Sequence, residues 1–123
     1  YFNIIHYLEK FGVVLTEHVG STELSEKGEI SQTDIDIFQR DLNWLQSADV
    51  VVAEVSTPSL GVGYELGIAE KLKTPVLCLY RPIKGKRLSA MINGNEKFQC
   101  QAYQGFDEAK THINNFLKQD QKT

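Results

Sequence analysis

The stretch ADVVVAEVSTPSLGVGYELG at residues 48–67 decides the fold. Residues 50–55 form an almost unbroken run of valine and alanine, which is typical of a strand covered on both faces of a parallel sheet. Pro58, Gly61 and Gly63 then predict a tight loop that leads into a helix over about 62–72. A strand, a glycine-containing loop and a helix in this order indicate one unit of an α/β sheet.

Further strands and helices alternate on both sides of this unit. Apolar runs predict strands at 13–15, 76–80 and 98–102. Apolar residues at helical spacing predict a helix over 1–11. Ser31 and Asp34 resemble a capping box and predict a helix over about 32–47. Further helices are expected at 88–92 and from Phe106 to Leu117. Residues 20–30 read as a surface loop. We therefore expect an open, doubly wound parallel α/β sheet, Rossmann- or flavodoxin-like, with helices on both faces.

Length and composition limit the classes of protein. The 123 residues suit one domain, to which we assign 1–118, with 119–123 as a frayed tail. A net charge of -3 argues against nucleic acid as a partner, and the absence of a long apolar run argues against a membrane. The two cysteines, Cys78 and Cys100, suit a reducing compartment, so cytoplasm or nucleus is expected. His6, His18 and His112 lack metal-ligand spacing, so no metal is expected.

The loop after Val55 is the first place to look for a site, because ligands of such sheets bind beyond the carboxyl ends of the strands. Gly61, Gly63 and Gly67 resemble a dinucleotide fingerprint, but three residues separate the second and third glycines, so we predict no NAD site. A glycine-rich helix N-terminus beside Ser59 could still hold a phosphate. The alternative is that the glycines only allow a tight turn and close packing, with Gly67 a packing residue.

Two acidic residues are candidates for chemistry. Glu65 is expected in the first turn of its helix, where it could be a nucleophile beside the ring of Tyr64, or merely stabilise the helix dipole. Asp41 falls on an apolar helix stripe, where burial would favour a protonated carboxyl able to donate to a leaving group. The alternative places Asp41 at the edge of that stripe, paired with Arg40 or solvent. Glu54, inside the valine run, is assigned a structural role.

Residues 48–55 and 58–67 closely resemble the 2′-deoxynucleoside 5′-phosphate N-hydrolases, relatives of the nucleoside 2-deoxyribosyltransferases. Residues 15–19, 41–46, 80–82 and 88–92 agree, so the resemblance covers nearly the whole chain. It implies hydrolysis of the N-glycosidic bond of 2′-deoxynucleoside 5′-monophosphates, without metal or organic cofactor. By this resemblance Glu65 is the nucleophile that forms a covalent ester with deoxyribose, and Asp41 is the acid/base partner. A retaining glycosidase needs two carboxyl groups about 5–5.5 Å apart, one to attack and one to donate a proton, so a pair of acids suits this reaction.

The resemblance also implies binding residues and a partner. Ser59, with the N–H groups around Gly61 and Gly63, would hold the 5′-phosphate. Ser89 and Met91 would reach the site from a neighbouring subunit, which implies a homodimer, and Ser89 favours a phosphate-bearing substrate.

The chain departs from the family at its start. The family begins with a strand and a Gly-Ser-Ile-Arg type loop, whereas Tyr1 falls inside the first helix. The strand would occupy the middle of the sheet, so we expect weak or no activity and reduced stability for this chain. Two alternatives to hydrolysis stay open: base exchange, in which a second base takes the sugar from Glu65, and a nucleotide-binding module without chemistry.

Overall fold

Four parallel strands form a single sheet in the computed structural model, which describes residues 13–15 and 33–121 and the side chains of 33–119. The strands lie in the order β1-β2-β3-β4, and their bounds are Val13–Leu15, Val51–Glu54, Val76–Tyr80 and Phe98–Ala102. Val51 of β2 is in register with Val13 of β1 and with Val76 of β3. The four strand predictions are confirmed. The helix expected at 1–11 and the loop expected at 20–30 lie outside the described residues.

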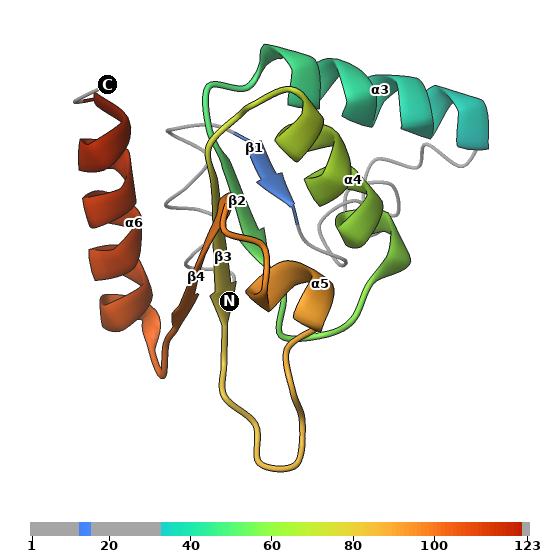
Figure 1. Cartoon of the computed structure of the whole chain (residues 1–123). Coiled ribbons are helices and arrows are strands. Elements are labelled where there is room, and N and C mark those ends of the chain that lie inside the picture. Colours follow the sequence, from blue (N-terminus) through green and yellow to red (C-terminus); the bar gives the residue numbers. More distant parts are fainter. Residues whose placement is uncertain (1–12, 16–32, 122–123) are drawn as a thin grey trace.

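Helices cover both faces of the sheet (Figure 1). α3 (Asp34–Ser47), α4 (Leu60–Lys71) and the short α5 (Ala90–Asn93) lie on one side, and α6 (Phe106–Gln121) lies on the other. This arrangement confirms the predicted open parallel α/β sheet. None of the described helices is both long enough and apolar enough to cross a membrane.

Alternation along the strands builds two separate layers of core. Val51 and Ala53 of β2 face the layer under α3 and α4, while Val52 faces the layer under α6. Side chains of a strand point alternately to the two faces, so a strand with both faces covered must be apolar throughout. The valine run at 50–55 therefore meets both layers, which Leu66 of α4 and Ile113 of α6 complete from outside.

β2 pairs directly with β1 on one side and with β3 on the other. Val14 and Leu15 stand opposite Val52 and Ala53, so among the described strands no gap interrupts the sheet. Direct pairing satisfies backbone groups that would otherwise be left without partners in the middle of the fold.

The predicted capping box of α3 and the predicted start of the C-terminal tail both differ from the structure. The capping box that opens α3 is formed by Thr33 and Asp36, not by Ser31 and Asp34: Asp36 N donates to Thr33 Oγ1 and Thr33 N donates to Asp36 Oδ2, both at 3.2 Å. At the other end of the chain α6 continues to Gln121, so residues 119–121 of the expected tail are helical. The amphipathic face explains this extension, because Phe116, near the last turn, is buried against the sheet.

A pair of leucines on and beside α4 tests this packing. Leu66 is 1% exposed and Leu72 is 43% exposed. We expect Leu66→Ala to lower the free energy of unfolding by roughly 2–5 kcal/mol, because it leaves a cavity against the sheet, and Leu72→Ala by less than about 1 kcal/mol. Urea unfolding of both variants measures the difference. Equal losses would show that α4 does not pack as described.

Candidate functional site

Helix α4 begins two residues earlier than the sequence predicts. Its N-cap is Ser59, whose Oγ accepts a hydrogen bond from Val62 N at 3.3 Å, and Gly63 N donates to the Ser59 carbonyl at 3.1 Å. The N–H groups of Leu60 and Gly61 have no partner among the described residues. The predicted anion site at this N-terminus therefore offers the amides of Leu60 and Gly61, together with the Ser59 hydroxyl, and not the amide of Gly63.

The glycines of α4 are not explained by backbone strain or by close packing. None of them has a positive φ, and a Cβ placed at Gly63 or Gly67 would have no atom within 4 Å. At Gly61 the nearest atom would be Ser59 Oγ at 3.9 Å, which is an ordinary contact. The prediction of Gly67 as a packing residue is therefore wrong. The absence of side chains at 61 and 63 leaves open space beside the first turns of the helix.

Glu65 lies in the second turn of α4, not in the first. The first turn holds no acidic residue, so stabilisation of the helix dipole, which fades beyond that turn, does not account for Glu65. Burial, and then the nearby negative charge of Asp41, raise the pKa of Glu65 to about 7. An unfavourably buried carboxyl beside a like charge is the environment in which functional acids are found.

Asp41 is less buried than its sequence pattern predicts. Its side chain is 31% exposed, and its Oδ1 accepts a hydrogen bond from Arg40 Nε at 3.3 Å. The Arg40 guanidinium also stacks over the Trp44 ring at 4.7 Å, and Trp44 itself is 43% exposed. The expectation of a buried Asp41 is wrong, because its side chain lies partly exposed beside Arg40. The alternative, an edge position paired with Arg40, is confirmed.

The structure nevertheless brings the two acids together. Asp41 of α3 and Glu65 of α4 line one small pocket of about 140 Å³ between these helices, which we call the acid pocket. Phe38 and Tyr64 stand at its wall with ring centroids 6.5 Å apart. The complete lining is Phe38, Asp41, Leu42, Leu45, Gly61, Tyr64, Glu65 and Ile68. Tyr64 thus shapes a pocket, as predicted.

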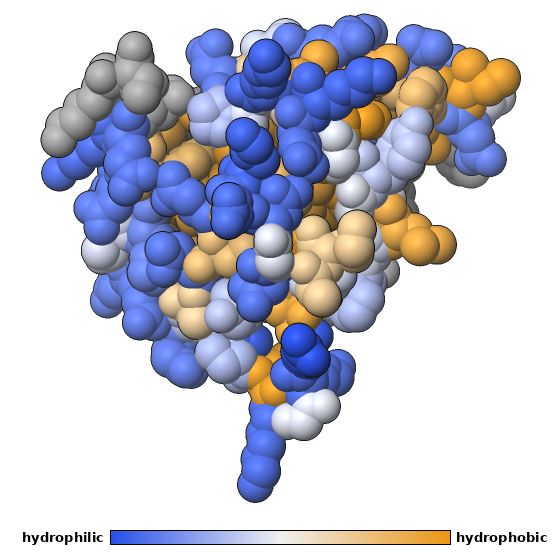
Figure 2. All heavy atoms as spheres, viewed as in Figure 1, coloured by the Kyte–Doolittle hydropathy of each residue, from blue (hydrophilic) through white to orange (hydrophobic). Residues whose placement is uncertain are grey.

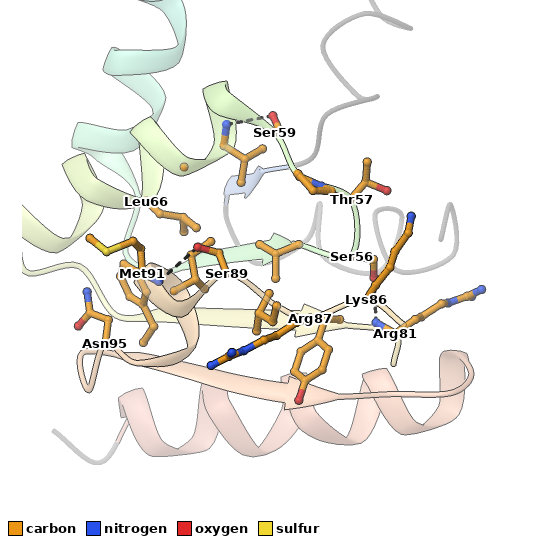
Figure 3. A pocket seen from close by; sticks show the side chains of 18 of the residues that line it. Ser56, Thr57, Ser59, Leu66, Arg81, Lys86, Arg87, Ser89, Met91 and Asn95 are labelled. Carbon is orange, nitrogen blue, oxygen red and sulfur yellow. Dashed lines mark hydrogen bonds between the residues drawn. The ribbon is translucent and has the colours of Figure 1, made fainter. Parts of the chain in front are cut away.

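A second pocket of about 760 Å³ lies against the other face of α4, between that helix, α5 and the loop after β3 (Figure 3). Ser59, Gly63, Ser89 and Met91 line it. No residue lines both pockets. Within one chain the predicted site residues therefore fall into two groups on opposite faces of α4.

A hydrogen-bonded network holds the loop that leads into α4. Glu54 accepts from Ser56 N at 2.7 Å and from Ser56 Oγ at 3.0 Å, and the buried Tyr103 hydroxyl donates to the same carboxylate. Arg81 N donates to Ser56 Oγ at 2.8 Å, which ties in the end of β3. Burial, reinforced by Glu54, raises the pKa of Tyr103 to about 12. The structural role expected for Glu54 is confirmed, whereas sequence reasoning missed Ser56, Arg81 and Tyr103.

The remaining candidate groups have ordinary surroundings. His112 Nε2 lies 3.0 Å from the Ala102 carbonyl, and His6 and His18 lie outside the described residues. Residues 13–15 and 33–121 contain no cluster of histidine, cysteine and carboxylate side chains that could hold a metal ion. Cys78 and Cys100 are free thiols.

The chain is similar to several proteins that share one name. A chain from Tetraodon nigroviridis named 5-hydroxymethyl-dUMP N-hydrolase is 57% identical over 95 residues, which cover 76% of this chain and 67% of that one. Proteins of the same name from Danio rerio and Homo sapiens are 47% and 52% identical, over 96% and 85% of this chain and 84% and 62% of their own. The match thus spans about two thirds of the length of most of these relatives.

A family model described as Nucleoside 2-deoxyribosyltransferase matches residues 1–116. This match covers both helices of the acid pocket and the loop and helix that carry Ser89 and Met91. The chain belongs to the nucleoside 2-deoxyribosyltransferase family.

Proposed function

We propose that this chain hydrolyses the N-glycosidic bond of 2′-deoxynucleoside 5′-monophosphates, releasing the free base and 2-deoxyribose 5-phosphate. The observation that carries the proposal is the pair of carboxyl groups, Asp41 and Glu65, that line one pocket beside the N-terminus of α4. The name 5-hydroxymethyl-dUMP N-hydrolase, shared by relatives at about half identity, supports this substrate class. It also makes 5-hydroxymethyl-dUMP the first substrate to test.

The two acids divide the chemistry. The ionised Glu65 carboxylate attacks the anomeric carbon of deoxyribose, and the bond between that carbon and the base breaks. Asp41 gives its proton to the departing base, so the base leaves as a neutral molecule. Asp41 then takes a proton from water as the water oxygen attacks the same carbon, which releases the sugar phosphate and restores Glu65.

The N-terminus of α4 is the proposed position of the 5′-phosphate. The Oγ of Ser59 already accepts from Val62 N, so its own proton remains free to donate to a phosphate oxygen. The amides of Leu60 and Gly61 and the positive end of the helix dipole add to this attraction. Bare backbone at 61 and 63 lets the substrate approach the helix closely.

We also propose that the chain acts as a homodimer, in which Ser89 and Met91 serve the site of the neighbouring subunit. In their own chain both residues line the pocket on the far side of α4 from Glu65. Met91 is 83% exposed, whereas Ile92 of the same helix packs against the core, so Met91 is the apolar side chain that α5 presents to a partner. The free thiols of Cys78 and Cys100 support cytoplasm or nucleus as the compartment.

Substitution of the two acids tests their roles. Glu65→Gln is expected to keep nucleotide binding and to reduce release of free base to background, because an amide cannot form the ester. Asp41→Asn is expected to lower the rate by roughly 10²–10⁴ through loss of the proton donor. Liquid chromatography of the base released from 5-hydroxymethyl-dUMP at high enzyme concentration measures both.

Ser47→Ala on the exposed end of α3 is the matched control and should react at the unsubstituted rate. Unchanged turnover in Glu65→Gln would exclude the proposed nucleophile. New nucleoside appearing after addition of a second base would show transfer to a base in place of hydrolysis.

The pKa of Glu65 predicts the direction of the pH profile. Attack requires the ionised carboxylate, and with a pKa of about 7 this group is mostly protonated at pH 6 and mostly ionised at pH 8. Asp41 must also hold the proton that it donates, so the two carboxyl groups must keep one proton between them. We expect kcat/KM to fall as the pH rises above about 7, where the pair loses that proton, because this ratio reports ionisations of the free enzyme. A rate that keeps rising above pH 7 would show that Asp41 does not donate a proton.

The same carboxyl predicts a pH-dependent effect on stability. Ionised Glu65 is unfavourable in the folded chain but not in the unfolded chain, so the destabilisation develops as pH rises from about 4.5 to about 7. Relative to the unsubstituted chain, Glu65→Gln should therefore add about 1–2 kcal/mol of stability at pH 8, a figure reduced for partial exposure, and little at pH 4. Urea unfolding at the two pH values measures this. A stabilisation that does not change with pH would show that the Glu65 carboxyl is not desolvated.

A further inference from the structure

Arg40 is an arginine that does not extend into water. The surface over α3 carries many hydrophilic side chains (Figure 2), and arginines in proteins are mostly exposed. The Arg40 side chain is nevertheless only 22% exposed, less than the 31% of its neighbour Asp41. Its guanidinium lies 4.7 Å from the centroid of the Trp44 ring, about one helical turn further along α3. This stacking holds the cation against the helix.

The ion pair between Arg40 and Asp41 does not follow from helix geometry alone. Consecutive residues of a helix point about 100° apart, so their side chains do not face each other. Arg40 Nε donates to Asp41 Oδ1 at 3.3 Å because the guanidinium turns along the helix, where the Trp44 ring contacts it. Asp41 Oδ2 has no hydrogen bond among the described residues. Asp41 is thus fixed at one carboxyl oxygen and open at the other.

Arg40 acts on the acid pocket through Asp41. Arg40 is not part of the pocket lining, whose titratable groups are Asp41, Tyr64 and Glu65 in the described part of the chain. Glu70, the other acid of α4, lines the larger pocket instead, and the described core beneath the helices contains no buried charged side chain. Glu65 has no ion pair or hydrogen bond among the described residues. The cation beside this pair of acids is therefore bound to Asp41 and not to Glu65.

This arrangement favours the proton on the acid that has to attack. A hydrogen-bonded arginine stabilises the ionised form of a carboxyl group, and an ionised carboxyl group favours protonation of a second one beside it. Burial, and then the charge of Asp41, raise the pKa of Glu65 to about 7. The proposed reaction requires the reverse distribution, with Glu65 ionised and the proton on Asp41. The free chain is therefore in a resting arrangement of the two acids.

We propose that Arg40, held by Trp44, is a positioning residue that keeps the shared proton on Glu65 in the free chain and so sets the pH range in which the two acids react. The inference rests on the proposed function. For the reaction, the proton leaves the Glu65 carboxyl group and binds Oδ2 of Asp41, which leaves Glu65 ionised and Asp41 able to protonate the departing base. The number of protons and the total charge stay the same, so this step needs no further reactant. Arg40 opposes the transfer, because it stabilises the ionised form of Asp41.

Carbon-13 NMR of the free chain locates the proton without requiring turnover. Aspartate and glutamate are labelled at the side-chain carboxyl carbon, and Asp41→Asn and Glu65→Gln assign the two signals. At pH 6 the Glu65 signal of the unsubstituted chain should be mainly that of a protonated carboxyl group. Arg40→Gln removes the charge but keeps a hydrogen-bond donor, so the Glu65 signal should move toward the ionised value and the Asp41 signal toward the protonated value. Arg40→Lys keeps the charge and should leave the protonation of both acids unchanged.

The pH profile of turnover is the second readout. With 5-hydroxymethyl-dUMP, the fall of kcat/KM above pH 7 should move upward by roughly half a pH unit in Arg40→Gln, because without the nearby positive charge the two acids keep their proton to higher pH. At pH 8 this variant should be roughly 2- to 5-fold faster than the unsubstituted chain, whereas loss of a merely structural contact would lower the rate at every pH. The matched control, Lys118→Gln, removes the same charge from an exposed position of α6 outside both pockets, and its profile should not move.

Substitution of Trp44 tests how Arg40 is held. Trp44→Ala removes the ring, so the profile should shift in the same direction as in Arg40→Gln, but less. Trp44→Phe keeps an aromatic ring and should restore the unsubstituted profile. Trp44 is 43% exposed, so both variants are expected to fold.

The outcomes separate this inference from the proposed function. Movement of the proton toward Asp41 in Arg40→Gln, together with the upward shift of the profile, supports the inference. An ionised Glu65 in the unsubstituted chain at pH 6, an unchanged profile in Arg40→Gln, or the same change in Arg40→Lys would overturn it. Absence of base release by the unsubstituted chain would count against the proposed function, and the NMR signals would still show whether Arg40 controls the position of the proton.

Discussion

Two acidic side chains that line one pocket between two helices are the constraint on which the rest of this structure depends. Asp41 and Glu65 belong to different helices, so their approach is set by how α3 and α4 pack on the sheet. Burial, and then the charge of Asp41, raise the pKa of Glu65, so an ionised Glu65 opposes folding. The apolar layer beneath, with Leu45 of α3 and Leu66 of α4 almost fully buried, offsets that cost and holds the two acids together.

A polar network at the carboxyl ends of the strands holds the loop that leads to Ser59 and α4. Glu54, Ser56 and Tyr103 come from β2, the following loop and the residue after β4, and their hydrogen bonds connect the three. A loop tied at both ends holds Ser59 at the start of α4 without the mobility that short glycine-containing loops otherwise have. The position of Ser59 therefore depends on a residue more than forty positions away along the chain. Under the proposed function, Ser59 positions the substrate phosphate, and this positioning draws on the rigidity of the sheet.

The sequence predicted the architecture well because its signals are local. The valine run at 50–55, the strand starting after Pro75 and the amphipathic pattern of α6 each report their surroundings over a few residues. Helix starts were less accurate, since Ser31 and Thr33 are both good N-caps and only the hydrogen bonds of Asp36 distinguish them. The burial of Asp41 was overestimated for a related reason: a helical stripe shows which side chains share a face, but not where the neighbouring helix ends. The only local indication of the network around Tyr103 is Glu54, an acid within the valine run. The sheet brings Tyr103 close to Glu54, so the sequence alone could not predict their contact.

The distribution of charge keeps the two acids apart from the basic loop between β3 and α5 within one chain. Asp41, Glu65 and Gly61 line the pocket on one face of α4, whereas Ser59, Leu60 and the cations Lys86 and Arg87 line the pocket on the other. Moving the cations beside the acids within one chain would let Lys86 or Arg87 form ion pairs with Asp41 and Glu65, which would lower the pKa of Glu65 and hold the carboxylates in salt bridges. Keeping the two sets of charges on different faces leaves the Glu65 carboxyl without an ion pair among the described residues, so burial and the charge of Asp41 keep its pKa raised.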